Sequence, residues 1–356
     1  MMDYTSIKTH KSLGEPARRA YFDDILRLVR EAEKYAEEKR NEFITPALLA
    51  ADREAFREKF INMLGWPLST YEPGRAPAVV KELVEENEQL RIYRISIEAL
   101  SDFWFRGLIY EPKEREANAS LVIINPGGGY CAEELIANGD YDASQMKNIG
   151  GKFLERGITV YAPQLLLWSD GTEYFKQPGT RQHIDARLKA IGGSIAALEI
   201  YCIRRAIDYF LEKEPISPLH IGMMGLSYGG FYSLYASAAE PRIKATFSSC
   251  FFCDRFCSET EPAGCRPDWL WKNSANTFFD AEVAALIAPR ALYIENGEKD
   301  TLFPIDASLL ELESLRPYYE AQNASDRLLY RKHEGGHEVG VGDIGFDFFI
   351  EQLLGE

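Results

Sequence analysis

The segment from residue 219 to residue 239 constrains the fold more than any other part of the chain. Its first residues, Leu219-His220-Ile221-Gly222-Met223-Met224, form an apolar run typical of a short strand buried on both faces. Gly225-Leu226-Ser227-Tyr228-Gly229 follows, and an apolar helical pattern continues from Phe231. A serine between two glycines at a strand-to-helix turn is typical of a nucleophile elbow, because glycine lets two backbone segments approach while the serine points outward. The alternative is a glycine-rich turn that contains a serine.

Strand-like and helix-like segments alternate after residue 90. The β-forming stretches 89–97 and 103–110, separated by Ser101-Asp102, predict an antiparallel pair. Further strands are predicted at 120–124, 158–162, 220–224, 243–249, 291–295 and 328–331, helices at 141–156, 193–211, 231–239 and 344–354, and long loops at 164–190 and 251–279. This alternation predicts an α/β domain with a mostly parallel central sheet and helices on both faces.

Residues 1–88 show a different, helical pattern. Apolar residues recur among charges from Glu15 to about Arg40, and Thr45-Pro46 begins a second helix that Gly65 and Pro67 end. No catalytic signal lies before residue 90. We therefore divide the chain into an N-terminal helical extension, residues 1–88, and a catalytic domain, residues 89–356. The extension is expected to pack on the domain, and its helices are the candidate contact of a homo-oligomer.

Composition narrows the choice of partner. The net charge is −15. Binding to nucleic acid or to an anionic membrane requires a basic face on the protein, and this sequence does not show one. No apolar run approaches the roughly 18 residues of a membrane helix, and the polar start of the chain lacks the features of a secretory signal. The sequence therefore predicts a soluble, cytoplasmic protein that binds a small neutral molecule.

Four of the six cysteines cluster as Cys250, Cys253, Cys257 and Cys265. Such a cluster raises the hypothesis of a zinc or iron–sulfur site. Cys250 ends a strand-like run, however, and no second compact C-x2-C pair follows. We predict buried reduced thiols without metal, and no disulfides in a cytoplasmic protein.

An activated serine needs a base within hydrogen-bond reach. Of the five histidines, His10 lies in the N-terminal tail, His183 in a long loop and His220 in a buried strand. His337 lies in the glycine-containing loop 334–338, between the last predicted strand and the final helix, where it can fold over the carboxyl edge of the sheet. His337 is therefore the predicted base, and His333 is the alternative.

The base in turn needs an acid that fixes its orientation. Asp300 follows the predicted strand 291–295 and a glycine turn, at the place where a carboxylate can meet His337. Glu295 and Glu298 are its rivals. The resulting order of serine, aspartate and histidine along the chain is the one expected for a nucleophile elbow of this kind.

The developing oxyanion needs fixed amide donors. One is expected to be the amide of Tyr228, directly after the serine. The other is expected from the loop Asn125-Pro126-Gly127-Gly128-Gly129-Tyr130, with Gly128 and Gly129 as the candidates. A turn or a phosphate nest is the alternative, but no G-K-[ST] follows and the spacing of a dinucleotide site is absent.

With these motifs in place, the chain resembles an α/β-hydrolase of the esterase branch that includes dienelactone hydrolases and acetyl xylan esterases. The resemblance rests on the glycine loop at 125–130, the elbow at 225–229, the turn 297–300 with Phe303-Pro304, and Gly336-His337-Glu338. It covers about residues 90 to 340. The oxyanion loop begins Asn125-Pro126, where the family often has His-Gly, and residues 1–90 match none of its motifs.

The resemblance implies ester hydrolysis through an acyl-enzyme on Ser227, with no metal or organic cofactor. It places substrate selection in the long loops, where Tyr130, Trp168, Phe252, Trp269 and Trp271 are the candidate contacts. These aromatic side chains favour a small acyl group, most simply acetyl, on a carbohydrate or another neutral alcohol. Peptide cleavage, acyl transfer and ligand binding without turnover are the alternatives on the same fold.

Overall fold

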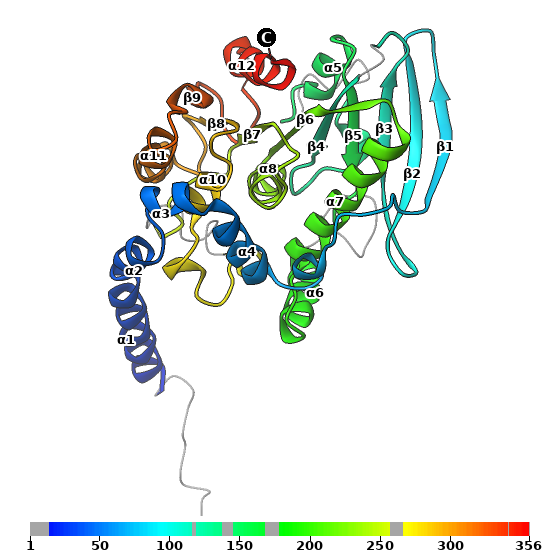
Figure 1. The fold of residues 1–356 in the computed structure, drawn as a ribbon. Coiled ribbons are helices and arrows are strands. Elements are labelled where there is room, and N and C mark those ends of the chain that lie inside the picture. Colours follow the sequence, from blue (N-terminus) through cyan, green and yellow to red (C-terminus); the bar gives the residue numbers. More distant parts are fainter. Residues whose placement is uncertain are drawn as a thin grey trace, which may run out of the picture.

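The computed structural model describes residues 14–115, 119–136, 145–167, 178–256, 266–340 and 342–355. Nine strands in these ranges form one sheet in the order β1-β2-β3-β5-β4-β6-β7-β8-β9 (Figure 1). They are β1 Val79–Glu86, β2 Leu90–Leu100, β3 Phe103–Pro112, β4 Ala119–Asn125, β5 Thr159–Pro163, β6 Ile216–Leu226, β7 Ala245–Ser249, β8 Ala291–Gly297 and β9 Leu328–His333.

The sheet is antiparallel at one end and parallel over the rest. Strands β1, β2, β3 and β5 pair antiparallel, which confirms the predicted pair 89–97 and 103–110. All pairs from β5 and β4 through β9 are parallel. The carboxyl ends of the parallel strands therefore meet at one edge of the sheet. Ligand and catalytic sites of open α/β sheets lie at this edge.

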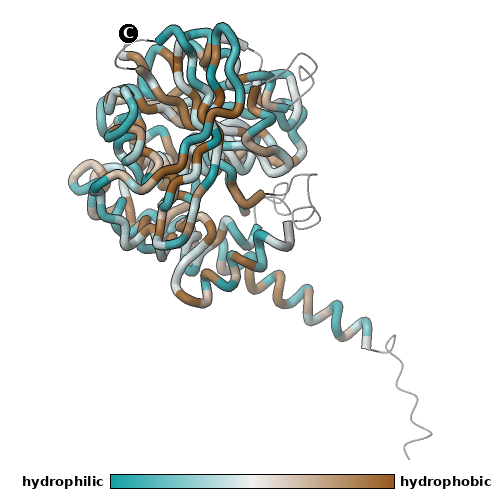
Figure 2. Tube along the Cα trace, turned by 90° about the vertical axis from the view of Figure 1, so that its right-hand side faces the viewer, coloured by the Kyte–Doolittle hydropathy of each residue, from teal (hydrophilic) through white to brown (hydrophobic). Residues whose placement is uncertain are grey.

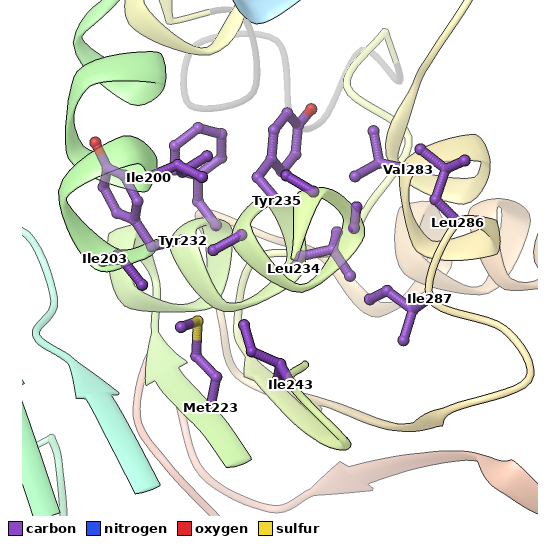
Figure 3. Packing of buried hydrophobic residues seen from close by; sticks show 14 of the residues in the cluster. Ile200, Ile203, Met223, Tyr232, Leu234, Tyr235, Ile243, Val283, Leu286 and Ile287 are labelled. Atoms are coloured by element: carbon purple, nitrogen blue, oxygen red, sulfur yellow. The ribbon is translucent and has the colours of Figure 1, made fainter. Parts of the chain in front are cut away.

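Helices cover both faces, as predicted. The larger core packs α7 (Ile195–Lys213), α8 (Tyr228–Ala239), α10 (Asp280–Ala285) and α11 (Ile305–Glu320) against one face. In Figure 3, Met223 of β6 lies beneath α8 next to Ile243, with side chains of α7 on one side and those of the segment that follows α10 on the other. The smaller core packs α5 (Ile149–Leu154) and α12 (Asp343–Leu354) against the other face. No helix among the described residues is both long enough and apolar enough to cross a bilayer.

Residues 14–64 form four α-helices: α1 Glu15–Lys34, α2 Ala36–Phe43, α3 Pro46–Ala51 and α4 Arg53–Leu64. The single helix predicted from Thr45 to Leu64 is wrong, because Asp52 lies between α3 and α4 and its side chain accepts a hydrogen bond from the Ala55 amide. Phe60 and Leu64 bury α4 in the main core. The extension thus packs on the domain through its later helices.

Helix α1 extends away from the rest of the molecule in Figures 1 and 2. It contains no buried residue, and Tyr21 and Leu28 on its apolar side are 69% and 71% exposed. The exposed apolar side of α1 is the candidate contact between copies of the chain. The homo-oligomer itself stays a prediction.

Several elements differ from the sequence prediction. The loop predicted at 164–190 contains α6 (Pro178–Ala190). Within the described part of the helix predicted at 141–156, residues 145–148 form turns and only Ile149–Leu154 form a helix, α5. Strand β1 and helices α10 and α11 were not predicted. Strand β1 carries five charged or exposed positions in a row, and α11 has a proline inside it, which explains why neither pattern was clear. Because β1 lies within 1–88, the sheet begins before residue 89, and the division into two domains stays a prediction.

Candidate active site

Ser227 lies between the end of β6 and the start of α8. Its backbone has φ 57° and ψ −115°, a conformation that residues other than glycine rarely adopt. A Cβ on Gly229 would lie 2.0 Å from the Asn125 carbonyl oxygen, and one on Gly225 would lie 2.4 Å from the Gly229 carbonyl carbon. Both positions therefore exclude any side chain. The predicted strand, strained turn and helix are all present, and residues held in such conformations cluster at active sites.

Asp300 and His337 are hydrogen bonded to each other. The distance from His337 Nδ1 to Asp300 Oδ2 is 2.8 Å, and Asp300 Oδ1 accepts from the amides of Leu302 and Phe303 at 2.8 and 3.2 Å. Burial raises the pKa of the Asp300 carboxyl, but the bond and charge of His337 and the two amides outweigh it, so that this pKa lies below its usual value. Asp300 is therefore an ionised acceptor that orients the imidazole.

The pairing of the strands places Ser227 at the same sheet edge as this pair. The Ser227 amide donates to the Ser249 carbonyl at 2.9 Å, and Ser249 pairs with Glu295 in β8. Asp300 follows β8, and His337 follows β9. The His337 ring is stacked on Phe303, with centroids 5.7 Å apart, and its side chain is 17% exposed. The buried carboxylate of Asp300 thus orients the imidazole of His337, which is partly exposed to solvent.

The rival residues have other partners. Glu295 is buried and accepts from Ser249 Oγ, the Gly340 amide and Tyr293 Oη at 2.7 to 2.9 Å. Glu298 is exposed and pairs with Lys332 at 2.8 Å. His333 Nδ1 accepts from the Gly335 amide at 3.2 Å. The Asp300–His337 pair is the one that the described contacts favour.

The glycine loop after β4 touches the elbow. The Tyr130 amide donates to the Gly127 carbonyl at 3.1 Å, which closes a turn over Gly128 and Gly129. A Cβ on Gly127 would lie 3.4 Å from the Leu226 carbonyl oxygen, so this backbone packs against the residue before Ser227. The loop therefore lies next to the turn that carries the Tyr228 amide, and its role as an oxyanion donor stays a prediction.

Tyr228 is held by a buried ionic cluster that the sequence analysis did not find. Its hydroxyl donates to Asp268 Oδ2 at 2.7 Å and accepts from Arg266 Nε at 2.6 Å. Arg181 of α6 donates to the same Asp268 oxygen at 2.7 Å and to Glu199 of α7 at 2.9 Å. Both Arg181 and Asp268 are almost fully buried. No motif marks these residues, because they come from distant segments that meet only in the folded chain.

The predicted substrate contacts occupy different surroundings. Trp168 lies outside the described residues. Tyr130 is partly exposed, and its hydroxyl accepts from the Gln145 amide at 3.3 Å. Trp269 is 2% exposed, with its ring 4.6 Å from the ring of Tyr228. Phe252 and Trp271 are buried in the larger core. Of these side chains, Trp269 contacts Tyr228, and Tyr130 belongs to the glycine loop that packs against the elbow.

Two surface cavities of about 600 and 710 Å³ lie elsewhere on the molecule. The first is lined by residues of β2 and α5, and the second by the start of β6 and the end of α12. None of the predicted site residues lines either cavity. The segments 168–177 and 257–265, next to the predicted site in sequence, fall outside the described residues.

The cysteines do not gather into one cluster within the described part of the chain. Cys131, Cys202, Cys250 and Cys253 are free thiols, and Cys257 and Cys265 lie outside the described residues. Cys250 instead lies beside Asp300 and His337. Burial, and then the charges of Asp300 and Glu295, raise the pKa of its thiol.

Comparison with known proteins agrees with this architecture. No family model matches the chain. The protein named "Putative hydrolase YtaP" of Bacillus subtilis (strain 168) is 25% identical over 272 residues, which are 74% of this chain and 89% of that protein. A solved structure described as a putative acetyl xylan esterase of Bacteroides fragilis matches 82% of this chain and 77% of its own, with a TM-score of 0.64 and 17% identity.

Two other solved structures show the same arrangement. The match with a methylesterase covers 92% of this chain and 68% of the methylesterase chain, with a TM-score of 0.68 and 16% identity. A glucuronoyl esterase of Solibacter usitatus matches 86% of this chain and 93% of its own, with a TM-score of 0.61 and 16% identity. The chain has the α/β-hydrolase fold. In this fold, a nucleophile elbow lies at a strand-to-helix turn at the top of the sheet.

Proposed function

We propose that the chain is a serine esterase that cleaves carboxylic esters through an acyl-enzyme. His337 accepts the proton of Ser227 as its oxygen attacks the ester carbonyl, and Asp300 holds the imidazole in the required orientation. His337 then gives this proton to the departing alcohol. Water repeats the sequence and releases the acid. The observation that carries the proposal is the 2.8 Å bond between His337 Nδ1 and Asp300 Oδ2, at the sheet edge where Ser227 lies on a strained turn.

The oxyanion of the tetrahedral intermediate would be held by two backbone amides. The first is proposed to be the Tyr228 amide, because Tyr228 is the first residue of α8 and the N–H groups at a helix N-terminus point outward, where they can meet an anion. A second amide, from Gly128 or Gly129, is proposed from the loop that packs on the elbow. Loss of one such donor in a serine hydrolase costs about 100- to 1000-fold in kcat.

The proposed substrate is a small neutral ester, most simply an acetyl ester of a carbohydrate. The names of the structural relatives support an ester of a carbohydrate, and partly exposed Tyr130 supports a flat apolar contact with a sugar ring. The net charge of −15 disfavours acidic polymers. A cytoplasmic location also stays a proposal.

The deciding experiment compares Ser227→Ala with Ser314→Ala, a control on the exposed side of α11. Both variants and the parent chain are assayed with p-nitrophenyl esters of rising chain length and with acetylated xylan oligosaccharides. Ser227→Ala should lose at least about three orders of magnitude in rate and keep its stability, whereas Ser314→Ala should match the parent. An organophosphonate should label Ser227, as peptide mass spectrometry would detect.

The same assays contain the results that would overturn this function. A Ser227→Ala variant with a tenth of the parent activity would exclude Ser227 as the nucleophile. Turnover of aminoacyl anilides without turnover of esters would make the protein a peptidase. Well-folded protein that turns over neither would be a binding module of the same fold. A clear preference for glucuronoyl or long-chain esters would keep the mechanism and change the acyl group.

A further inference from the structure

Cys250 supplies a third potential metal ligand beside the Asp300–His337 pair. Its Sγ, one carboxylate oxygen of Asp300 and one ring nitrogen of His337 all lie within 4.8 Å of one another. Among the described residues, this is the one group of three such side chains with so close a spacing. Three different donor types therefore converge from three separate strand ends.

The backbone fixes the direction of the Cys250 side chain. Cys250 directly follows β7, and its φ of 49° is an uncommon conformation for a residue with a side chain. Its amide donates to the Glu295 carbonyl at 2.8 Å, and its Sγ lies 3.3 Å from the Glu338 carbonyl oxygen. Cys250 is fully buried. The thiol is thus held against the loop that carries His337, so a ligand site there would be largely preformed.

A thiolate, an imidazole and a carboxylate together suit Zn²⁺ better than a hard cation such as Mg²⁺. Zinc binds these atoms at about 2.0 to 2.3 Å in a tetrahedral arrangement, which leaves a fourth position for water when the protein gives three ligands. Because the three atoms lie within 4.8 Å of one another, a single ion placed between them could be reached by all three side chains. His337 is partly exposed and offers a path for entry of the ion.

We propose that Cys250, Asp300 and His337 bind a single Zn²⁺ ion that reversibly switches off the esterase. The inhibitory part rests on the proposed function, since it requires His337 to be the base. The ion is an inhibitor here and takes no part in the reaction.

The proton balance of this step is defined. Zinc takes the place of the thiol proton on Cys250 Sγ, and that proton leaves to solvent. Zinc also replaces the hydrogen of His337 Nδ1, which moves to Nε2. The Nδ1–H···Oδ2 bond to Asp300 is lost, and both groups become ligands. An Nε2 that carries a hydrogen cannot accept the proton of Ser227, so ester cleavage stops. A chelator reverses each of these changes.

The test uses full-length protein treated with a chelator and then titrated with Zn²⁺ or Co²⁺. Calorimetry gives the stoichiometry, and repetition in buffers of different protonation enthalpy gives the number of protons released. Cobalt bound to a thiolate gives an intense near-ultraviolet charge-transfer band. We expect one ion per chain, about one proton released per ion, the cobalt band, and zinc inhibition that the chelator relieves.

Cys250→Ser and the matched variant Cys253→Ser separate this site from the cysteine cluster. Cys253 is equally buried and lies three residues away. Cys250→Ser should lose the cobalt band and weaken zinc binding by more than the roughly 10- to 100-fold that loss of an outer-shell partner costs. Both variants should keep the ester turnover of the parent in the presence of chelator. Cys250→Ala serves as a second variant if the serine variant does not fold.

Each alternative outcome overturns the proposal in a recognisable way. Absence of zinc binding in a chain that hydrolyses esters would remove the site and leave the proposed function intact. Binding that depends on Cys253 and not on Cys250 would place the metal in the cysteine cluster. Binding at Cys250 without inhibition of an active esterase would remove the switch. Binding at Cys250 in a chain that cleaves no ester would refute the proposed function, and with it the switch.

Discussion

Helix α8 carries two tyrosines in nearly the same ionic setting, seven residues apart. The Tyr228 hydroxyl bonds Asp268 at 2.7 Å and Arg266 at 2.6 Å. The Tyr235 hydroxyl, two turns further from Ser227, accepts from Arg255 at 2.9 Å and donates to Asp280 at 3.4 Å. Both tyrosines are buried. The pair therefore separates what such a cluster does for stability from what it does for catalysis.

We predict that Tyr228→Phe and Tyr235→Phe lose similar stability and that only Tyr228→Phe loses catalytic rate. Each change deletes a hydroxyl bonded to charged partners, and such bonds contribute about 1.5 to 3 kcal/mol. The free energy of unfolding should fall by about 2 to 3 kcal/mol in both variants. The Tyr228 amide is a proposed oxyanion donor, so the freed side chain should lower kcat by about 10- to 100-fold, less than loss of a whole donor.

Urea unfolding and steady-state hydrolysis of p-nitrophenyl acetate measure the two effects. Affinity for a boronic acid that mimics the tetrahedral intermediate is the third readout, because it follows the oxyanion donors and should weaken in parallel with kcat, with KM little changed. Tyr235→Phe should keep kcat within about twofold. Equal losses of kcat in both variants, or an unchanged kcat in Tyr228→Phe, would refute the idea that the Asp268 cluster positions the oxyanion donor.

Three further predictions concern pH and assembly. The lowered pKa of Asp300 means that its ionised form stabilises the fold above about pH 4 and that this contribution is lost as the pH falls below that value. The free energies of unfolding of Asp300→Asn and of the parent should therefore converge as the pH falls below about 4. Burial, and then the charges of neighbouring carboxylates, raise the pKa of Glu311 well above its usual value, so the parent should lose stability as the pH rises above about 4.5. Glu311→Gln should therefore unfold at a higher temperature than the parent at pH 8 but not at pH 4. Equal pH dependence of the unfolding temperature in the two proteins would contradict this. If α1 joins chains in a homo-oligomer, Leu28→Ser should lower the mass measured by analytical ultracentrifugation. Asp23→Ser, on the other side of the helix, should leave this mass unchanged. A monomeric parent would exclude the contact.

The parts that could be predicted from sequence depend on local signals. The elbow was predictable because two glycines, a serine and the flanking periodicities are confined to about twenty residues. The parallel strands were predictable because strands buried on both faces are short apolar runs. Helix α6 was missed because its apolar residues do not recur on one face.

The ionic cluster around Tyr228 could not be predicted for a different reason. Arg181, Glu199 and Asp268 are single charged residues with no shared motif, and such residues are usually exposed. Their burial follows from contacts between α6, α7 and the segment after β7. A buried charge is tolerated only when partners surround it, and those partners are known only from the folded chain.

The two interpretations of Cys250 illustrate how sheet register decides what a residue can do. In sequence, Cys250 is nearest to Cys253, and this spacing suggests a C-x2-C metal site. In the sheet, Ser249 pairs with Glu295, so the residue that follows β7 emerges beside the turn that follows β8. Asp300 lies in that turn, and β9 then brings His337 over the same edge. Parallel pairing therefore gathers residues 250, 300 and 337 into one group, although 87 positions separate the first from the last. A ligand set assembled in this way can regulate the proposed active site directly, because its histidine and its aspartate are the proposed catalytic pair.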